Sequence, residues 1–138
     1  MENNRENTST LYAQGSSLLI KFQGLVARPA MLGIRAAVLA VALANDIDRV
    51  LIDLSGAFVA LSHEDWRDFT RDCASREALR LTTALLVPPL SEEAAWEHAE
   101  RMSDYGRLTI VFADRDAAYR WAGLSFPRGL WVATASAV

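Results

Sequence analysis

Asp53 is the side chain in this sequence best placed to do chemistry. It lies near the end of the apolar run RVLIDLS, residues 49–55, which is typical of a strand buried on both faces. Carboxylates at the carboxyl ends of parallel strands often line ligand sites. The alternative is that Asp53 accepts hydrogen bonds from backbone amides and fixes the turn at Ser55 and Gly56. We favour this structural role, since no second carboxylate lies at a spacing that forms an acid–base pair.

The other candidates for chemistry are two histidines and one cysteine. His63 and His98 belong to no HExxH pattern and to no zinc-ligand spacing, and both lie on expected helices among charged residues. We therefore expect two solvated histidines and no metal. Cys73 is in helical register with Trp66 and Phe69, which indicates a buried, unreactive thiol. No nucleophile with a base can be assembled, so we predict no catalytic residue, no cofactor and no enzyme.

The elements that position these residues follow from hydrophobic periodicity. Apolar alternation at 10–14 and 18–24, around Gly15, predicts a β-hairpin, and 30–44 predicts a helix that follows Pro29. Three strand–helix units come next, with strands at 49–55, 81–87 and 107–112, and helices that begin after Ser62, at 92–104 and at 116–122. The expected fold is α/β: a single-layer, mixed, mostly parallel sheet of four to six strands flanked by helices.

The boundaries of this domain are expected at residues 9 and 124. Residues 1–8 are polar and predict a disordered tail, whereas 125–138 contain an apolar run and predict an arm or an edge strand. Trp131 lies in that last segment, after Pro127, where an exposed aromatic side chain would suit an interface. Trp96, in contrast, is expected in the core, like Trp66.

The helix at 30–44 carries apolar residues on two stripes, so that one can cover the sheet while the other needs a partner. We expect this partner to be a second copy of the chain. The predicted interface residues are Ile34, Val38 and Val41, together with Trp131 in the C-terminal segment.

The connection at 56–61 is unusually apolar for a loop. It suggests a site for a small apolar ligand at the loops after the parallel strands, with Asp53, Ser55, Phe58 and Leu61 as candidate residues. The alternative, which we favour, is that Phe58 and Leu61 pack into the core.

Composition and charge exclude several classes of partner. The 138 residues carry 14 basic and 17 acidic side chains, a net charge of −3, so no basic surface for nucleic acid is expected. The N-terminal residues lack the apolar segment of a signal peptide. The run at 30–44 is short for a membrane span and contains Arg35. We expect a cytoplasmic protein with no membrane span.

Two stretches resemble the STAS family of anti-sigma-factor antagonists and its relatives. They are VLIDLSG at 50–56, similar to a strand that precedes the family's functional loop, and IVFADRDAAYRW at 110–121, similar to the closing strand and helix of the STAS-like branch. With the element order, the resemblance spans residues 18–124. It implies a STAS-like fold, which is shared with lipid-transfer domains, and a non-enzymatic regulatory module that binds a protein partner of unknown identity.

One departure from the family concerns phosphorylation. In the antagonists, a serine after this loop is phosphorylated by a partner kinase. Counted without a gap, that position falls on His63 here, and the glycine that follows is replaced by Glu64. The resemblance therefore carries no phosphorylation site to this chain. Ser62, the nearest hydroxyl, is expected to cap a helix.

Overall fold

A β-hairpin begins the described chain and supplies two strands, β1 (Asn7–Gln14) and β2 (Ser17–Val26). The structure, a computed structural model, describes residues 7–74, 81–124 and 133–137. Gly15 takes a positive φ of 61° in the turn, a conformation that glycine adopts without steric cost. β1 begins earlier than expected, because Thr8, assigned above to a tail, pairs with Gln23 of β2.

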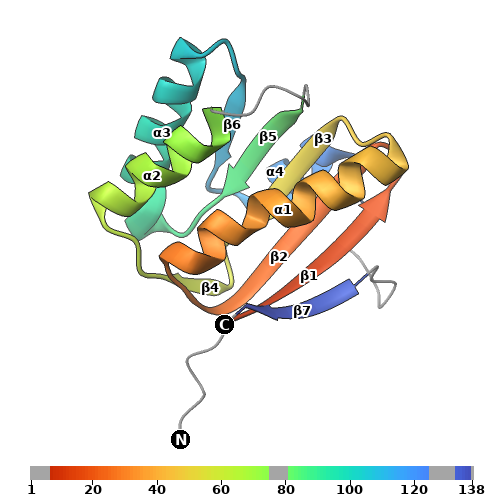
Figure 1. Cartoon of the computed structure of the whole chain (residues 1–138), viewed down its shortest axis with the longest axis horizontal. Helices are drawn as coiled ribbons and strands as arrows, with labels where there is room; N and C mark the ends of the chain where they lie inside the picture. The colour runs from red at the N-terminus through yellow and green to blue at the C-terminus, as the bar shows by residue number, and fades with distance from the viewer. Residues whose placement is uncertain (1–6, 75–80, 125–132, 138) are drawn as a thin grey trace, which may run out of the picture.

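The hairpin extends into a mixed sheet of seven strands with the order β6-β5-β3-β2-β1-β7, and β4 pairs separately with β2. The pairs β2–β3, β3–β5, β5–β6 and β2–β4 are parallel, while β1–β2 and β1–β7 are antiparallel. The mixed, mostly parallel sheet is thus confirmed (Figure 1). The remaining strands are β3 (Arg49–Asp53), β4 (Ala57–Val59), β5 (Thr82–Leu86), β6 (Thr109–Phe112) and β7 (Ala133–Ala137).

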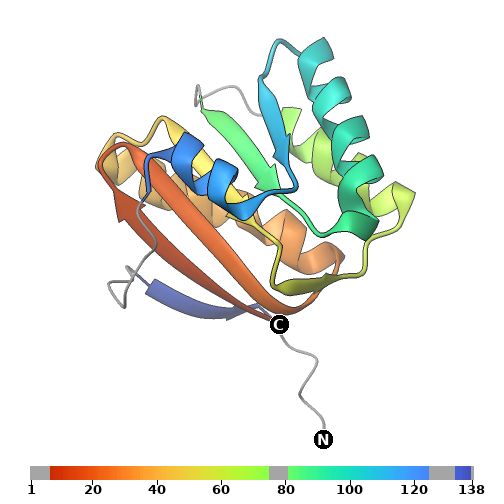
Figure 2. The ribbon, with the colours of Figure 1, turned by 180° about the vertical axis from the view of Figure 1, so that it is seen from behind.

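Helices cover both faces of the sheet. One face carries α1 (Arg28–Asn45), α2 (His63–Ala74) and α3 (Glu92–Asp104), and a short 3₁₀ turn, η2 (Pro89–Ser91), precedes α3. The other face carries α4 (Arg115–Ala122), seen from behind in Figure 2. Because successive strand residues point to opposite faces, Leu18 and Ile20 of β2 pack under α1 to α3, whereas Leu19 packs in the cluster that contains α4.

The apolar stripe of α1 that contains Ile34 was predicted to form an interface, but in the structure it packs on the core. Ile34 is only 4% exposed and lies in the core, and Val38 and Val41 are half-buried and pack against it. The stripe that faces solvent contains Ala36 and Leu43, and Leu43 is 70% exposed. The interface assignment of Ile34 was therefore wrong, because α1 uses its bulkier, branched stripe to cover the sheet. Trp131, the other interface candidate, lies outside the described residues.

α1 also has the length and composition of a membrane-crossing helix, which we had not expected. It is the one such helix in the described part of the chain. Core helices of soluble proteins and signal sequences meet the same criterion; 24% of this helix is buried, with Met31 and Ile34 in the core.

Candidate functional site

The carboxyl end of β3, where a ligand site was predicted, is held by hydrogen bonds within the chain. Asp53 is fully buried. Its Oδ1 accepts hydrogen bonds from the backbone N–H of Ser55 at 2.9 Å and from the Ser55 hydroxyl at 2.6 Å. Its Oδ2 accepts one from the hydroxyl of Tyr119 in α4 at 2.7 Å. Both carboxylate oxygens are therefore used to fix the turn after β3 and to attach α4.

The environment of Tyr119 keeps its hydroxyl protonated. Burial raises its pKa above the ordinary value, and the hydrogen bond to Asp53 and the negative charge of that carboxylate raise it further. The Arg115 guanidinium, 5.4 Å from the ring centroid, acts in the opposite direction but is outweighed. Tyr119 thus serves as a constant hydrogen-bond donor to Asp53, a structural role.

The apolar connection after β3 forms the short strand β4, which the sequence analysis had treated as a loop. Its three residues pair with Gly24, Leu25 and Val26 of β2. Because side chains alternate along a strand, Ala57 and Val59 pack against the core while Phe58 between them is 71% exposed. The expectation that Phe58 packs inside was therefore wrong, although Leu61 does pack against the core.

Ser62 caps α2, as its position predicted. Its Oγ accepts a hydrogen bond from the backbone N–H of Asp65 at 3.1 Å, and the Asp65 carboxylate accepts one from the backbone N–H of Ser62 at 2.9 Å. This reciprocal pair is a capping box, with aspartate in the place of the usual glutamate.

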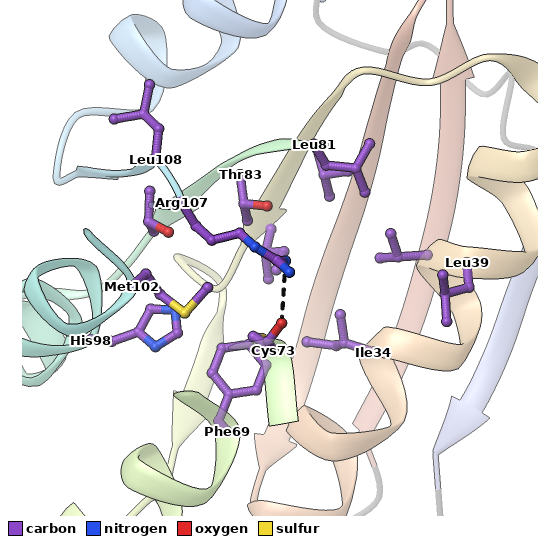
Figure 3. A pocket seen from close by; sticks show the side chains of 14 residues that line it. Ile34, Leu39, Phe69, Cys73, Leu81, Thr83, His98, Met102, Arg107 and Leu108 are labelled. Carbon is purple, nitrogen blue, oxygen red and sulfur yellow. Dashed lines mark hydrogen bonds between the residues drawn. The ribbon is translucent and has the colours of Figure 1, made fainter. Parts of the chain in front are cut away.

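A cavity of about 170 Å³ lies at the other end of the strands, near the starts of β3, β5 and β6 (Figure 3). It lies between α1, α2, α3 and the sheet and is partly open to solvent. The four residues predicted to bind a ligand do not line it. Its lining residues are mostly apolar: Ile34, Val38, Leu39, Val50, Ile52, Phe69, Cys73, Leu81, Thr83, His98, Met102, Arg107, Leu108 and Thr109.

His98, expected in solvent, is buried in the wall of this cavity and is only 3% exposed. Its ring stacks on Phe69 with centroids 4.9 Å apart, and its Nδ1 lies 2.7 Å from the Thr70 hydroxyl. That hydroxyl donates its single proton to the carbonyl of Trp66, so we assign the Nδ1 proton to His98 as the donor to Thr70. Burial lowers the pKa of His98 to about 4, and the ring is neutral at pH 7.

A sequence signal for the burial of His98 existed but was not used. The buried residues of α3 are Ala95, His98, Ala99 and Met102, at spacings of three, four and seven, which is the pattern of a core-facing stripe. The polar type of His98 and its charged neighbours masked this pattern. Trp96 shows the opposite error: it was expected in the core, but it is 55% exposed.

Arg107 is the second residue of the cavity that the sequence analysis missed. It lies two residues before β6 and is half-buried, and its guanidinium lies among the apolar lining side chains (Figure 3). Its Nη1 donates to the backbone carbonyl of Cys73, near the end of α2, at 3.3 Å. No motif identifies such an arginine, because its partners come from elements distant in sequence.

The carboxyl end of the sheet presents two exposed, large apolar side chains. Phe58 on β4 is 71% exposed, and Leu90 in η2 is 98% exposed. Both lie in connections that follow neighbouring parallel strands, β4 after β3 and η2 after β5. Large apolar side chains gathered at one place on a surface often mark a site of interaction with another protein.

The described residues contain no group of three or more His, Cys, Asp or Glu placed to hold a metal ion. His63 is exposed, and its Nδ1 lies 3.9 Å from a carboxylate oxygen of Glu97. Cys73, half-buried rather than fully buried, contributes to the cavity wall.

Comparison with known proteins shows similarity at the level of the fold. No protein-family model and no curated protein matches the sequence. An uncharacterised protein of the DUF3478 family with a SpoIIAA-like fold, from Shewanella loihica PV-4, is 21% identical with a TM-score of 0.52, over 88% of this chain and 98% of that chain. The anti-sigma factor antagonist SpoIIAA in its unphosphorylated form is 16% identical with a TM-score of 0.50, over 86% and 99%. The chain thus has the SpoIIAA-like, STAS-like fold that its sequence predicted.

Proposed function

We propose that this chain is a non-enzymatic, cytoplasmic regulatory module that binds another protein through the carboxyl end of its sheet. The observation that carries the proposal is the exposure of Phe58 and Leu90, which lie in the connections after the neighbouring parallel strands β3 and β5. Aromatic and aliphatic side chains that enter a partner's pockets contribute a large share of binding energy at interfaces. The likeness in fold to a protein named as an anti-sigma factor antagonist supports the same class of function.

The polar groups near this end support binding rather than catalysis. Asp53 uses both carboxylate oxygens in bonds to Ser55 and Tyr119, and Ser62 is engaged in its capping box. A general base or a nucleophile must reach a substrate, whereas these groups hold the scaffold together.

Charge around the two apolar side chains defines the chemistry of the partner. The next helices after β4 and η2 are α2 and α3, and their first turns contain Glu64, Asp65, Glu92 and Glu93. We infer a partner with apolar pockets bordered by basic side chains. Such complementarity speeds association and excludes acidic surfaces.

We also propose that the chain forms a homodimer through the solvent-facing stripe of α1. This stripe contains Gly33, Ala36, Ala40 and Leu43, which are all exposed. An apolar stripe on a helix is normally covered, and small residues let a second helix approach closely.

Affinity capture from the source cells, with the purified chain as bait, tests the docking end. We expect wild type to retain one protein at a fixed ratio and the double variant Phe58→Ser, Leu90→Ser to lose it. Tyr105→Ser is the matched control, because Tyr105 is 59% exposed and follows α3 at the opposite end of the strands. Equal retention by the double variant and wild type would contradict the proposal, as would a partner that only Tyr105→Ser loses.

A further inference from the structure

We propose that the groove between α2 and α3 binds a phosphate group, and that Arg67 and Arg101 hold its oxygen atoms from the two sides. The two helices lie side by side on one face of the sheet (Figure 1), and the groove between them has a volume of about 200 Å³. Every helical residue that lines it lies beyond the first turn of its helix, away from the carboxyl end of the sheet. The proposal therefore does not depend on the proposed protein partner.

Two guanidinium groups are available in this groove. Arg67 of α2 and Arg101 of α3 are both exposed, and neither has a hydrogen bond or an ion pair with another residue in the described part of the chain. Glu97, one helical turn before Arg101, lies 3.9 Å from His63 of α2 instead. A guanidinium presents its N–H donors in a planar fork that matches two oxygens of a phosphate.

The positions of the arginines create a repulsion that an anion would relieve. Arg67 and Arg71 are four residues apart on α2, where like charges destabilise a helix, and Arg101 lines the same groove from α3. Arg71 and Arg101 lie in the last turns of their helices, where the helix dipole favours a cation. Arg67 lies one turn earlier and gains nothing from the dipole. The dipoles therefore do not account for the whole cluster.

The charge of the groove matches a dianion. Arg28 and Arg71 share the carboxylate of Asp68, with N–O distances of 2.9 and 3.1 Å, so this trio keeps one positive charge. The two unpaired guanidinium groups add one charge each, and Asp104 of the lining removes one, which leaves an excess of two positive charges. A phosphate monoester carries about −1.5 to −2 at pH 7, whereas a single carboxylate would compensate only half of this excess.

Methyl NMR on the full chain with ¹³C-methyl threonine tests the proposal. Thr70 is 4% exposed and lines the groove, and its hydroxyl already donates to the Trp66 carbonyl, so Thr70 reports on the ligand without holding it. Thr109, at the start of β6 and outside this groove, is the internal control. At constant ionic strength, we expect inorganic phosphate to shift the Thr70 signal saturably with a Kd on the order of 1 mM, and acetate to bind about tenfold more weakly.

Variants assign the shift to the two arginines. Arg67→Gln and Arg101→Gln should each weaken phosphate about tenfold and remain folded, because both positions are exposed. Arg120→Gln is the matched control, since Arg120 is an exposed arginine on α4, on the other face of the sheet. The proposal is overturned if Thr70 shows no shift at about 20 mM phosphate, well above the expected Kd. Equal affinity for acetate and phosphate, or wild-type affinity in both arginine variants, also overturns it.

A second probe distinguishes a free phosphate from one carried by a protein side chain. N-acetyl-phosphoserine amide has the phosphate group of a phosphorylated residue, and N-acetylserine amide lacks it. Tighter binding of the phosphoserine compound than of inorganic phosphate would support a phosphorylated protein segment as the ligand, and weaker binding would support a small phosphate. N-acetylserine amide should not shift Thr70, and a shift equal to that of its phosphorylated counterpart would contradict phosphate recognition.

Discussion

The Tyr119 hydroxyl donates to Oδ2 of Asp53 at 2.7 Å and thereby joins two residues that lie 66 positions apart in the sequence. Asp53 ends β3, and Tyr119 lies in α4, which covers the face of the sheet opposite α1 to α3. The bond attaches α4 to the sheet at the point where the chain turns toward β4. Both oxygens of the Asp53 carboxylate thus serve the fold.

We expect Tyr119→Phe to destabilise the protein by about 1–3 kcal/mol, because it leaves a fully buried carboxylate oxygen without its hydrogen-bond donor. Urea unfolding followed by circular dichroism measures the change. Tyr105→Phe is the control, since Tyr105 is 59% exposed and its stability should match wild type. If both variants unfold at the wild-type urea concentration, Tyr119 does not anchor α4.

Acid should destabilise the fold through His98. In the unfolded chain its pKa is near 6.5, whereas burial lowers it to about 4 in the native state, so the unfolded state binds more protons between these values. This contribution is complete above pH 6.5 and is lost as the pH falls toward 4. The loss amounts to about 3 kcal/mol.

The variant His98→Asn isolates this effect. Asparagine can keep a donor toward Thr70 but does not titrate, and other groups titrate alike in both proteins. We expect wild type to lose its stability advantage over His98→Asn between pH 6.5 and 4, as measured by urea unfolding at several pH values. Parallel stability curves for the two proteins would show that His98 is not the group responsible.

Loss of the capping box at the start of α2 should also be measurable. Ser62→Ala removes the acceptor for the Asp65 backbone N–H, and we expect a loss of about 1 kcal/mol in urea unfolding. Ser103→Ala, at an exposed position in the last turn of α3, should have little effect and serves as the control. Identical unfolding midpoints would mean that water replaces the cap without cost.

The proposed dimer predicts that Leu43→Glu yields a folded monomer. Leu43 is 70% exposed, so a glutamate there disturbs no core contact but places charge within the stripe of α1. Sedimentation velocity should show a dimer for wild type and a monomer for the variant. Leu90→Glu, at a position 98% exposed in η2, should remain dimeric. A monomeric wild type would refute the proposed homodimer.

Much of the fold could be predicted from the sequence because apolar residues recur at clear strand or helix spacings along most of its elements. The helix expected at 92–104 has those bounds as α3, and the buried run after Arg49 is β3 with its last four residues buried. β4 was missed because three residues are too few to show alternation, and Phe58 in its centre was taken for a core residue. Its pairing with β2 depends on the path of the chain rather than on a local pattern.

The candidate cavity could not be predicted because it is made by packing between elements. His98 comes from α3 and Arg107 from the loop two residues before β6, and they share a cavity with Val38 of α1. On α1, periodicity revealed two apolar stripes but not which one faces the sheet. Ile34 is covered and Leu43 is exposed because of the way α1, α2 and α3 are arranged together on one face of the sheet.

The pairing of β7 with β1 has a mechanical consequence. Asn7 at the start of β1 pairs with Ala137 at the end of β7, so the two strand ends lie together at one edge of the sheet (Figure 1). In an antiparallel ladder the hydrogen bonds run across the strands. A force that pulls these two ends apart breaks the β1–β7 hydrogen bonds one pair at a time, starting from this end. A shearing force, in contrast, would load all of these hydrogen bonds at once. Tension applied between Asn7 and Ala137 would therefore detach β7 first, while the parallel strands that line the cavity stay paired.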